Sequence, residues 1–393
     1  MSFLLAFLGF AALIILHELG HFVAAKGVGM RVDRFSLFFP PLLWRRKRGE
    51  TEYAIGAVPL GGYVKITGMN PHEEIPPEVA HRAYFRQPVW KRIVVIGAGP
   101  AVNIVLAFLI LWVLIWANGV RETTNVVEKV DTLPAVGTLA PGDRIIAVDG
   151  VRGDFATLKK QIVSHKCAGE QTDGCEAATP AKITVVLHGE ERTEVVKPVY
   201  NAEANDMLVG FRAKLTPPRP IGPVDAAGRS VSEMWFFTTK TVETIANIFN
   251  AEQRKQVSGV VGSYEVTRQT IELSLERAVY LLAIISLSLG VINLFPFLPL
   301  DGGHIFWALA EKVRGRAIPF SVMERAGFIG FVLVIALFMV GFTNDIGRLT
   351  GEGFGDGGGA HSPTLPAAEA VSQAPHVVRE ADHEQRDHQH ETD

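Results

Sequence analysis

The sequence predicts a polytopic α-helical membrane protein with four transmembrane helices, a membrane-associated β-hairpin and an inserted extracytoplasmic β domain. Hydrophobic residues make up 48% of its 393 residues, and four stretches approach the ~20 apolar residues that cross a bilayer. A segment with the alternation and turn residues of β-strands separates the second stretch from the third. The transmembrane helices are expected at residues 1–26, 93–118, 278–303 and 326–343.

Lysine and arginine side chains predict on which side of the membrane each connecting segment lies. They are concentrated in residues 27–92 and in the loop 304–325, and cytoplasmic loops carry such an excess. Segments 119–217 and 218–277 are then extracytoplasmic. The Gly-, His- and acid-rich tail, 344–393, is expected to be disordered. The net charge of −3 indicates no nucleic-acid partner, whereas membrane lipid is an expected partner.

The most informative motif is the run from His17 to His21, His-Glu-Leu-Gly-His, inside the first apolar stretch. Histidines four residues apart share one face of a helix and can bind one zinc ion, with the glutamate between them as general base. No other side chain from residue 3 to 25 is charged or a histidine, and ionisable groups at that depth mark functional sites. This favours a zinc hydrolase, with Glu18 catalytic, over a chance match on a soluble helix.

A catalytic zinc site usually has three protein ligands, so one ligand remains to be found. Asp301 is the first carboxylate at the end of the third stretch, and two glycines that permit close approach follow it. Pro296 and Pro299 break the helix before it. A folded-back segment there would raise Asp301 to the depth of the histidines. Asp301 is the predicted third ligand, and His304 is the alternative.

The polar side chain that precedes this break is Asn293. Its amide could donate a hydrogen bond to a substrate carbonyl or to the oxyanion that develops during peptide hydrolysis. Asn293 is therefore predicted to take part in catalysis. Asn103, in the second stretch, is a second buried amide that must find a partner.

Two further segments have strand character. Residues at about 52–66 are predicted to form two short strands around a Pro-Leu-Gly-Gly break, either as a hairpin dipping towards the membrane or as an ordinary soluble one. Residues 119–217 are expected to fold as one β domain with a helix at 155–164. In the following segment, 218–277, an amphipathic helix at 229–250 could lie on the outer membrane surface or pack on the β domain.

The chain has two cysteines, Cys167 and Cys175, both in the segment expected to face outward. A disulfide that closes this small loop is plausible in an oxidising compartment. Two free thiols are the alternative.

Taken together, these motifs resemble the site-2 protease family of intramembrane zinc metalloproteases, in particular its bacterial RseP-like branch. HELGH, PLGGYVK, GAGPAVN and NLFPFLPLDGG occur in the family's order and cover nearly the whole chain except the tail. The resemblance implies that His17, His21 and Asp301 bind one Zn²⁺ and that Glu18 is the catalytic acid and base. It also implies that Asn293 interacts with substrate.

The resemblance further implies that the hairpin presents an edge strand to an unwound substrate, and that residues 119–217 are a PDZ-like domain. Implied substrate contacts are Tyr53, Ile55, Val58, Gly61, Gly62, Tyr63, Asn103 and Pro296. The implied location is the bacterial inner membrane, with the active site towards the cytoplasm and the PDZ-like domain in the periplasm.

The expected function is regulated intramembrane proteolysis. The expected partner is a single-pass membrane protein, such as an anti-sigma factor, already cut on its outer side. The PDZ-like domain could bind a peptide or the new C-terminus, or could exclude bulky substrates. The alternatives are an inactive membrane-bound PDZ scaffold and a metal-ion transporter. A scaffold needs no zinc ligands in lipid, and the fourth apolar stretch lacks the polar residues expected of a transporter.

Overall fold

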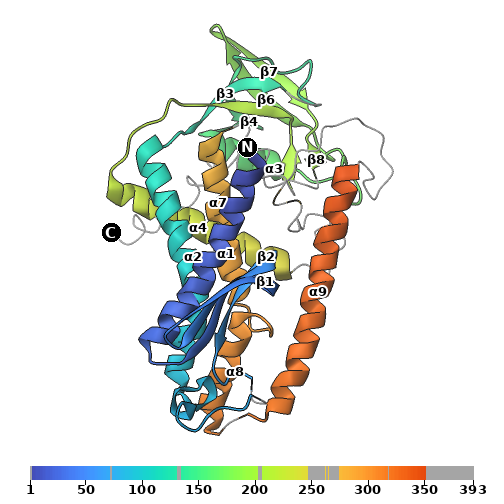
Figure 1. The fold of residues 1–393 in the computed structure, drawn as a ribbon. Coiled ribbons are helices and arrows are strands. Elements are labelled where there is room, and N and C mark those ends of the chain that lie inside the picture. The colour runs from blue at the N-terminus through green and yellow to red at the C-terminus, as the bar shows by residue number, and fades with distance from the viewer. Residues whose placement is uncertain are drawn as a thin grey trace, which may run out of the picture. The chain divides into compact units, whose positions relative to one another are not determined.

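A computed structural model describes residues 2–70, 73–130, 134–201, 206–246, 262, 264, 274–316 and 318–350. These residues divide into two compact units (Figure 1). The first unit holds the residues up to Val113 and from Met234 onward, and the second holds Leu114–Glu233. The boundaries therefore fall within two helices, α2 and α4, described below.

The described residues contain four helical segments that are long and apolar enough to cross a membrane, which agrees with the four predicted from sequence. These are Leu4–Gly27 in α1 (Ser2–Gly27), Val89–Asn118 (α2), Leu275–Asn293 (α7) and Ser321–Gly347 in α9 (Phe320–Thr350). Helix α2 begins four residues before the predicted start. Helix α9 extends into residues 344–350, which were predicted to belong to the tail.

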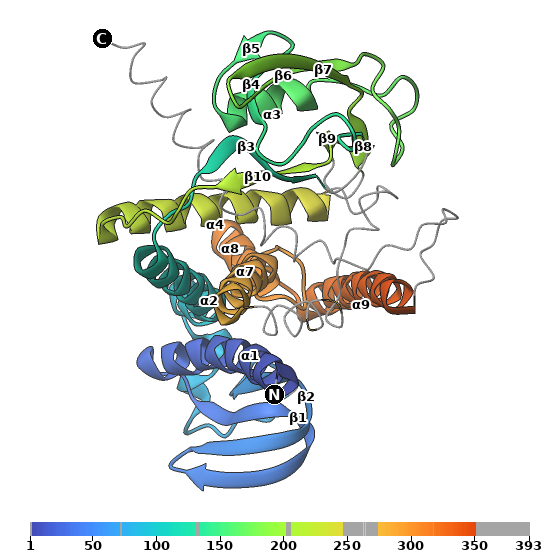
Figure 2. The same ribbon diagram turned by 90° about the horizontal axis from the view of Figure 1, so that it is seen from above.

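Helices α1, α2 and α7 lie side by side (Figures 1 and 2), and glycines line their contacts. A Cβ atom at Gly20 of α1 would meet the carbonyl of Ala98 in α2, and one at Gly290 of α7 would meet the carbonyl of Pro100. Small residues let helix backbones approach closely where the hydrophobic effect cannot drive association. Gly20 of the first apolar stretch and Gly290 of the third therefore let α1 and α7 each pack closely against α2.

The third apolar helix is shorter than predicted. Helix α7 ends at Asn293, residues 294–300 form a turn, and a separate helix, α8 (Asp301–Arg314), begins at the predicted zinc ligand. Leu298 is buried in the turn, and Gly330 of α9 leaves space for its carbonyl. The interruption that Pro296 and Pro299 predicted is present, and α8 occupies much of the predicted loop 304–325.

The segment predicted as a hairpin at 52–66 pairs differently. It forms one bent strand, β2 (Thr51–Ile66), whose partner is β1 (Val32–Arg48). Residues 34–37 of β1 pair with 62–65 on one side and with 52–55 on the other, while 44–48 pair with 51–55. The four stretches thus lie in the order 44–48, 51–55, 34–37 and 62–66. The two parts of 52–66 do not pair with each other, because 34–37 lies between them.

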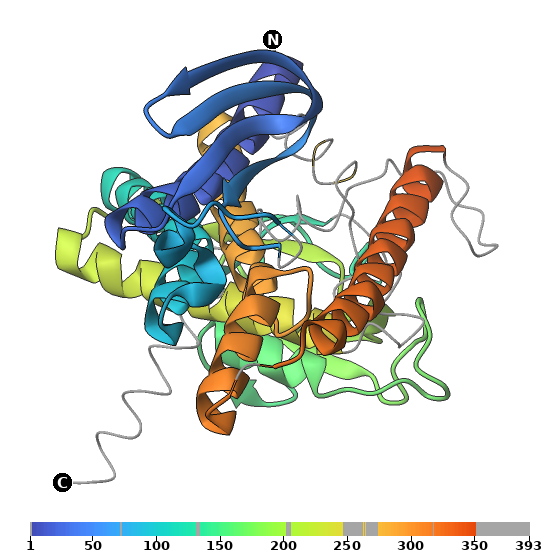
Figure 3. The ribbon, with the colours of Figure 1, turned by 60° about the horizontal axis from the view of Figure 1, so that its bottom comes forward.

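Figures 2 and 3 both show this sheet against α1, with α1 between the sheet and α2. Phe22 of α1 packs against Phe35 and Tyr53 of the sheet, with ring centroids 5.2 and 5.9 Å away. A buried cluster that includes Ala25, Met30 and Ile66 continues this contact. The sheet is therefore held on the helix that carries the HExxH motif.

The second unit is the predicted β domain. Its main sheet has the order β10-β3-β4-β6-β7, with β5 paired to β4, and β8 and β9 form a separate pair. The strands are β3 (Thr123–Val130), β4 (Arg144–Val148), β5 (Val151–Arg152), β6 (Ala181–Leu187), β7 (Glu190–Val196), β8 (Val199–Asn201), β9 (Asp206–Leu208) and β10 (Phe211–Leu215).

One hydrophobic core supports this sheet, and α3 (Phe155–Val163) contributes Leu158 and Ile162 to it. The predicted helix at 155–164 is present as α3. The amphipathic helix predicted at 229–250 is present as α4 (Pro223–Ala246). The predicted disorder of the tail concerns residues 351–393, which lie outside the described residues.

Candidate metal centre

Two histidines and one carboxylate, from α1 and α8, converge on one point. His17 and His21 are both 7% exposed, and their Nε2 atoms lie 3.2 Å apart. Oδ2 of Asp301 lies 3.3 Å from each of these nitrogens. Among the described residues, these three are the group of His, Cys, Asp or Glu side chains whose ligand atoms come close enough to hold a metal ion. The group contains Asp301 and not His304.

The three ligand atoms form a nearly equilateral triangle that suits zinc. A tetrahedral ion with bonds of about 2.0–2.1 Å separates its ligand atoms by roughly 3.3 Å, which matches the three distances. Oδ2 of Asp301 is buried and has no hydrogen-bond partner among the described residues. A buried carboxylate oxygen without a donor is costly, and a cation at the centre of the triangle would satisfy it. The residues therefore fit a zinc ion.

Asp301 reaches the histidines because the chain folds back immediately before it. A Cβ atom at Gly302 would collide with the carbonyls of Leu294 and Phe295, and one at Gly303 would collide with Phe297 and Leu298. Only glycine at both positions lets the 294–300 turn lie directly on the first turn of α8. The two glycines after Asp301 therefore serve the geometry of the turn.

The histidine nitrogens that face away from the triangle contact α2. Nδ1 of His21 donates to the carbonyl of Val95 at 2.9 Å, so this ring keeps its proton on Nδ1 and leaves the Nε2 lone pair for a metal.

Nδ1 of His17 contacts the fully buried amide of Asn103, with Nδ2 at 3.2 Å. Oδ1 of Asn103 has no partner among the described residues. Rotating the amide by 180° places Oδ1 against the Nδ1–H of His17 and again frees Nε2 for a metal. The structure places Asn103, which was predicted to contact substrate, against Nδ1 of His17.

Gly99 of α2 faces both histidine rings, with no room for a side chain between them. A Cβ atom there would overlap with Nε2 of His21 and would lie 2.9 Å from Cε1 of His17. Gly97, two residues earlier, has only Ile305 at 3.9 Å from the same hypothetical atom. The sequence alone did not distinguish Gly99 from Gly97. The rule that ligand histidines need a partner for their second nitrogen could have pointed to α2.

Glu18 lies next to one edge of the sheet. The backbone N–H of Val64 donates to its carboxylate, and a Cβ atom at Gly62 would lie 3.1 Å from its Cγ. Residues 62–66 form the outer stretch on this side of the sheet. Glu18 therefore lies between the His17–His21–Asp301 triangle and an edge strand.

The other predicted substrate contacts are distributed unevenly. Gly62 is at the edge beside Glu18, whereas Tyr53 and Ile55 belong to a stretch that is paired on both sides. Gly61 is covered by the ring of Phe39, which pairs with Val58. Tyr63 stacks on Phe39 and accepts a hydrogen bond from Arg34. An added strand can therefore reach the backbone of 62–66 but not that of 52–55.

Asn293 and Pro296 flank the fold-back turn. Asn293 is the last residue of α7 and is half-buried, while Pro296 is exposed. The structure gives Asn293 no hydrogen bond to the ligand triangle within the residues it describes. In the β domain, Cys167 is joined to Cys175 by a disulfide, with the Cα atoms 5.7 Å apart.

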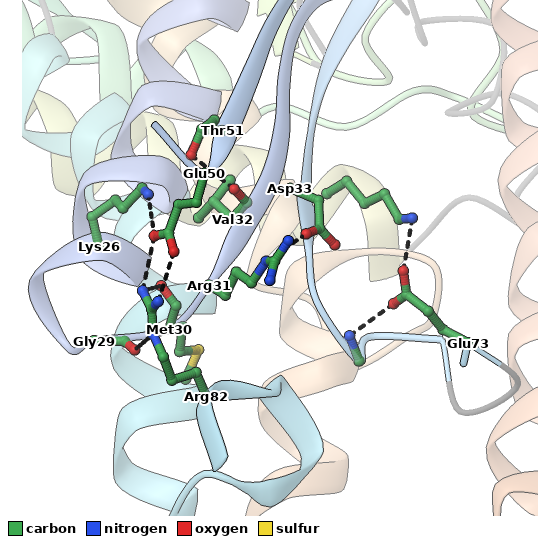
Figure 4. Close-up of polar contacts among 12 residues, drawn as sticks. Lys26, Gly29, Met30, Arg31, Val32, Asp33, Glu50, Thr51, Glu73 and Arg82 are labelled. Carbon is green, nitrogen blue, oxygen red and sulfur yellow. Dashed lines mark hydrogen bonds and ion pairs between the residues drawn. The ribbon is translucent and has the colours of Figure 1, made fainter. Parts of the chain in front are cut away.

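A second polar cluster lies at the end of α1 (Figure 4). We call Lys26, Glu50 and Arg82 the Glu50 cluster. Glu50, in the turn between β1 and β2, accepts from Lys26 at 2.6 Å and from both terminal nitrogens of Arg82 at 2.6 and 2.8 Å. The hydrogen bonds from Arg82, and to a smaller extent the one from Lys26, lower the pKa of Glu50 to about 2. The cluster fixes the sheet to the last turn of the HExxH helix.

A buried pair of histidines and an aspartate, with a glutamate inside the HExxH motif and on helices of membrane-spanning length, defines the class of membrane-bound metalloproteases. The chain belongs to peptidase family M50, whose model matches residues 5–337, and it is a zinc metalloprotease of that family. A protein of Nostoc sp. named "Putative zinc metalloprotease" is 30% identical over 361 residues, covering 89% of this chain and 97% of the relative. The Regulator of sigma-E protease RseP of Escherichia coli is 27% identical over 437 residues, covering 86% of this chain and 96% of RseP.

Proposed function

We propose that this protein is an intramembrane zinc protease that cuts the transmembrane segment of a single-pass membrane protein. The observation that carries the proposal is the position of Glu18, between the His17–His21–Asp301 triangle and the sheet edge at 62–66. A general base must be within hydrogen-bond reach of the water it activates, and a peptide on this edge would pass beside it.

Zinc bound to the triangle would supply a Lewis acid that polarises the scissile carbonyl and lowers the pKa of water towards about 7. Glu18 takes a proton from the attacking water and returns it to the leaving amine. Asn293 donates to the oxyanion from the end of α7. Val95 and Asn103 hold the two histidine rings in place throughout.

A transmembrane helix hides its carbonyls in its own hydrogen bonds, so the substrate must unwind before it is cut. An extended peptide can add to a free sheet edge through main-chain hydrogen bonds. Because 52–55 is paired on both sides, we assign this role to 62–66. Gly62 at this edge leaves room for the substrate backbone close to Glu18.

The biological setting that we propose is regulated intramembrane proteolysis in a bacterial inner membrane. The substrate would be a single-pass protein, such as an anti-sigma factor, that another protease has already shortened on the outer side. The β domain would act as a periplasmic PDZ-like module that excludes bulky ectodomains or binds the new C-terminus. Support comes from the order of the family motifs and from the similarity to RseP.

The test is cleavage of a tagged single-pass substrate, already shortened on its outer side, by purified protein in detergent. Wild type should release a new fragment, and a zinc chelator should abolish it. Glu18→Gln should lower the rate by about 10²–10⁴-fold while the bound zinc stays at one per chain. Glu276→Gln, the same exchange in the first turn of α7, should cleave normally. Failure of wild type to cleave despite full zinc loading would contradict the proposal.

A further inference from the structure

The sheet has a second edge, which the proposed chemistry does not use. Residues 44–48 form it, and two inner stretches separate it from 62–66. At about 4.8 Å per strand, this edge lies roughly 14 Å across the sheet from the one beside Glu18. It carries Arg45, Arg46, Lys47 and Arg48, which we call the basic edge, and all four are exposed.

The basic edge differs from the other cations around the sheet. Lys26, Arg31, Arg34, Lys65 and Arg82 each pair with a carboxylate at 2.6–3.0 Å. No ion pair within the described residues involves any side chain of the basic edge. Four adjacent positive charges therefore lie together without a direct ion pair, although the five cations named above each have one.

Large apolar side chains precede these charges along the same strand. Leu43 is 72% exposed, Trp44 is 49% exposed, and Phe39 at the preceding bend is 41% exposed. Because side chains alternate along a strand, Trp44 shares a face with Arg46, and Leu43 shares the other with Arg45. Both faces of this strand thus change from apolar to cationic at the same level. Trp44 lies at this boundary, which is where tryptophans are found at membrane–water interfaces.

The Glu50 cluster fixes the level of this change relative to α1. The basic edge ends at the turn that holds Glu50, and Glu50 binds Lys26 at the end of the apolar helix. At 3.3 Å per residue, the four basic residues extend over roughly 10 Å, which covers one headgroup layer of a bilayer. Leu43, Trp44 and Phe39 would then enter the hydrocarbon beside α1.

We propose that the basic edge binds the headgroups of anionic phospholipids, and that this contact sets the depth and tilt of the sheet in the membrane. The proposal rests on the membrane placement in the proposed function but not on its chemistry. Clusters of four or more Lys or Arg next to a membrane-spanning helix attract anionic lipid, and each such side chain contributes about fivefold. If lipid holds the sheet at the basic edge, the opposite edge, 62–66, stays at a fixed depth in the membrane beside Glu18.

The test uses the full chain reconstituted in phosphatidylcholine vesicles that contain brominated phosphatidylglycerol or, in parallel, brominated phosphatidylcholine. Quenching of Trp44 is taken as the difference between wild type and Trp44→Phe. The quenching should show that the wild-type site beside Trp44 binds brominated phosphatidylglycerol at least about tenfold more strongly than brominated phosphatidylcholine. Adding about 0.5 M salt should weaken this preference. Changing all four basic-edge residues to Gln should abolish it. The control, Lys312, Arg314 and Arg316 changed to Gln, should leave it intact.

The outcomes separate this inference from the proposed protease activity. Glu18→Gln should keep the full lipid preference, since the readout does not involve cleavage. Equal quenching by both brominated lipids in wild type would show contact with hydrocarbon but no headgroup selection, and absence of quenching would place Trp44 in water. Either result overturns the proposal. Retention of one zinc per chain by the fourfold Gln variant shows that it is folded.

Discussion

The metal centre and the Glu50 cluster both join α1 to distant parts of the chain, but they differ in how completely their polar atoms are satisfied. In the Glu50 cluster, both oxygens of Glu50 receive short hydrogen bonds and the side chains are partly exposed. In the metal centre, Oδ2 of Asp301 is buried without a hydrogen-bond donor among the described residues. The first arrangement is complete as a structural tie, whereas the second requires a cation.

The largest expected effect comes from closing the space beside the histidines. Gly99→Ala places a Cβ atom on the ring of His21 and against His17, so both rings must leave the triangle. Misplacement by about 1 Å can cost 10²-fold in rate, and we expect zinc content well below one per chain with at least that loss of cleavage. Metal analysis and the cleavage assay measure both.

Gly97→Ala is the matched control, because its Cβ atom would meet only Ile305 at an ordinary contact distance. It should keep zinc and activity, and alanine favours the helix. If Gly99→Ala bound zinc as wild type does, the close approach of α2 to the metal centre would be wrong.

An intermediate effect is expected at Asn103. Asn103→Leu removes the hydrogen bond to Nδ1 of His17 and keeps the side-chain size, so the ring loses its orienting partner. Loss of such a partner typically weakens metal binding 10–100-fold, which competition with a chromophoric chelator can measure. Ser286→Ala, which removes a bond to the backbone carbonyl of Asn103, should leave zinc affinity unchanged. Unaltered affinity in Asn103→Leu would assign the amide a packing role only.

The smallest effect is expected in the Glu50 cluster. Glu50→Gln should keep zinc and lower the free energy of unfolding by about 1 kcal/mol, since the lost bonds are charge-assisted but partly exposed. Because the pKa of Glu50 is lowered from 4.5 to about 2, its contribution is present above pH 4.5 and disappears as the pH falls towards 2.

Thermal unfolding in detergent over this pH range should therefore show the two proteins converging at low pH. Glu78→Gln, an exposed carboxylate outside the cluster, serves as the reference. A constant difference between wild type and Glu50→Gln down to pH 2 would contradict the role assigned to the charge.

The sequence was sufficient for the parts that depend on local spacing. Histidines four residues apart must share a helix face, and two prolines before Asp301 must interrupt α7, so the convergence of His17, His21 and Asp301 and the fold-back could be predicted. The pairing of 34–37 between 52–55 and 62–65 could not, because strand order depends on contacts between segments far apart in the chain. The contacts of Gly99 and Asn103 with the histidines likewise depend on how α2 packs against α1.

The fold-back before Asp301 also bears on the order in which the protein is made. Asp301, the proposed third ligand, comes far after His17 and His21 in the chain. It reaches the histidines only after α2, α7 and the turn 294–300 are in place. A nascent chain with only its first helices inserted has the HExxH motif but no complete ligand triangle. Biosynthesis itself thus delays the protease centre until nearly all of its own membrane scaffold has been assembled.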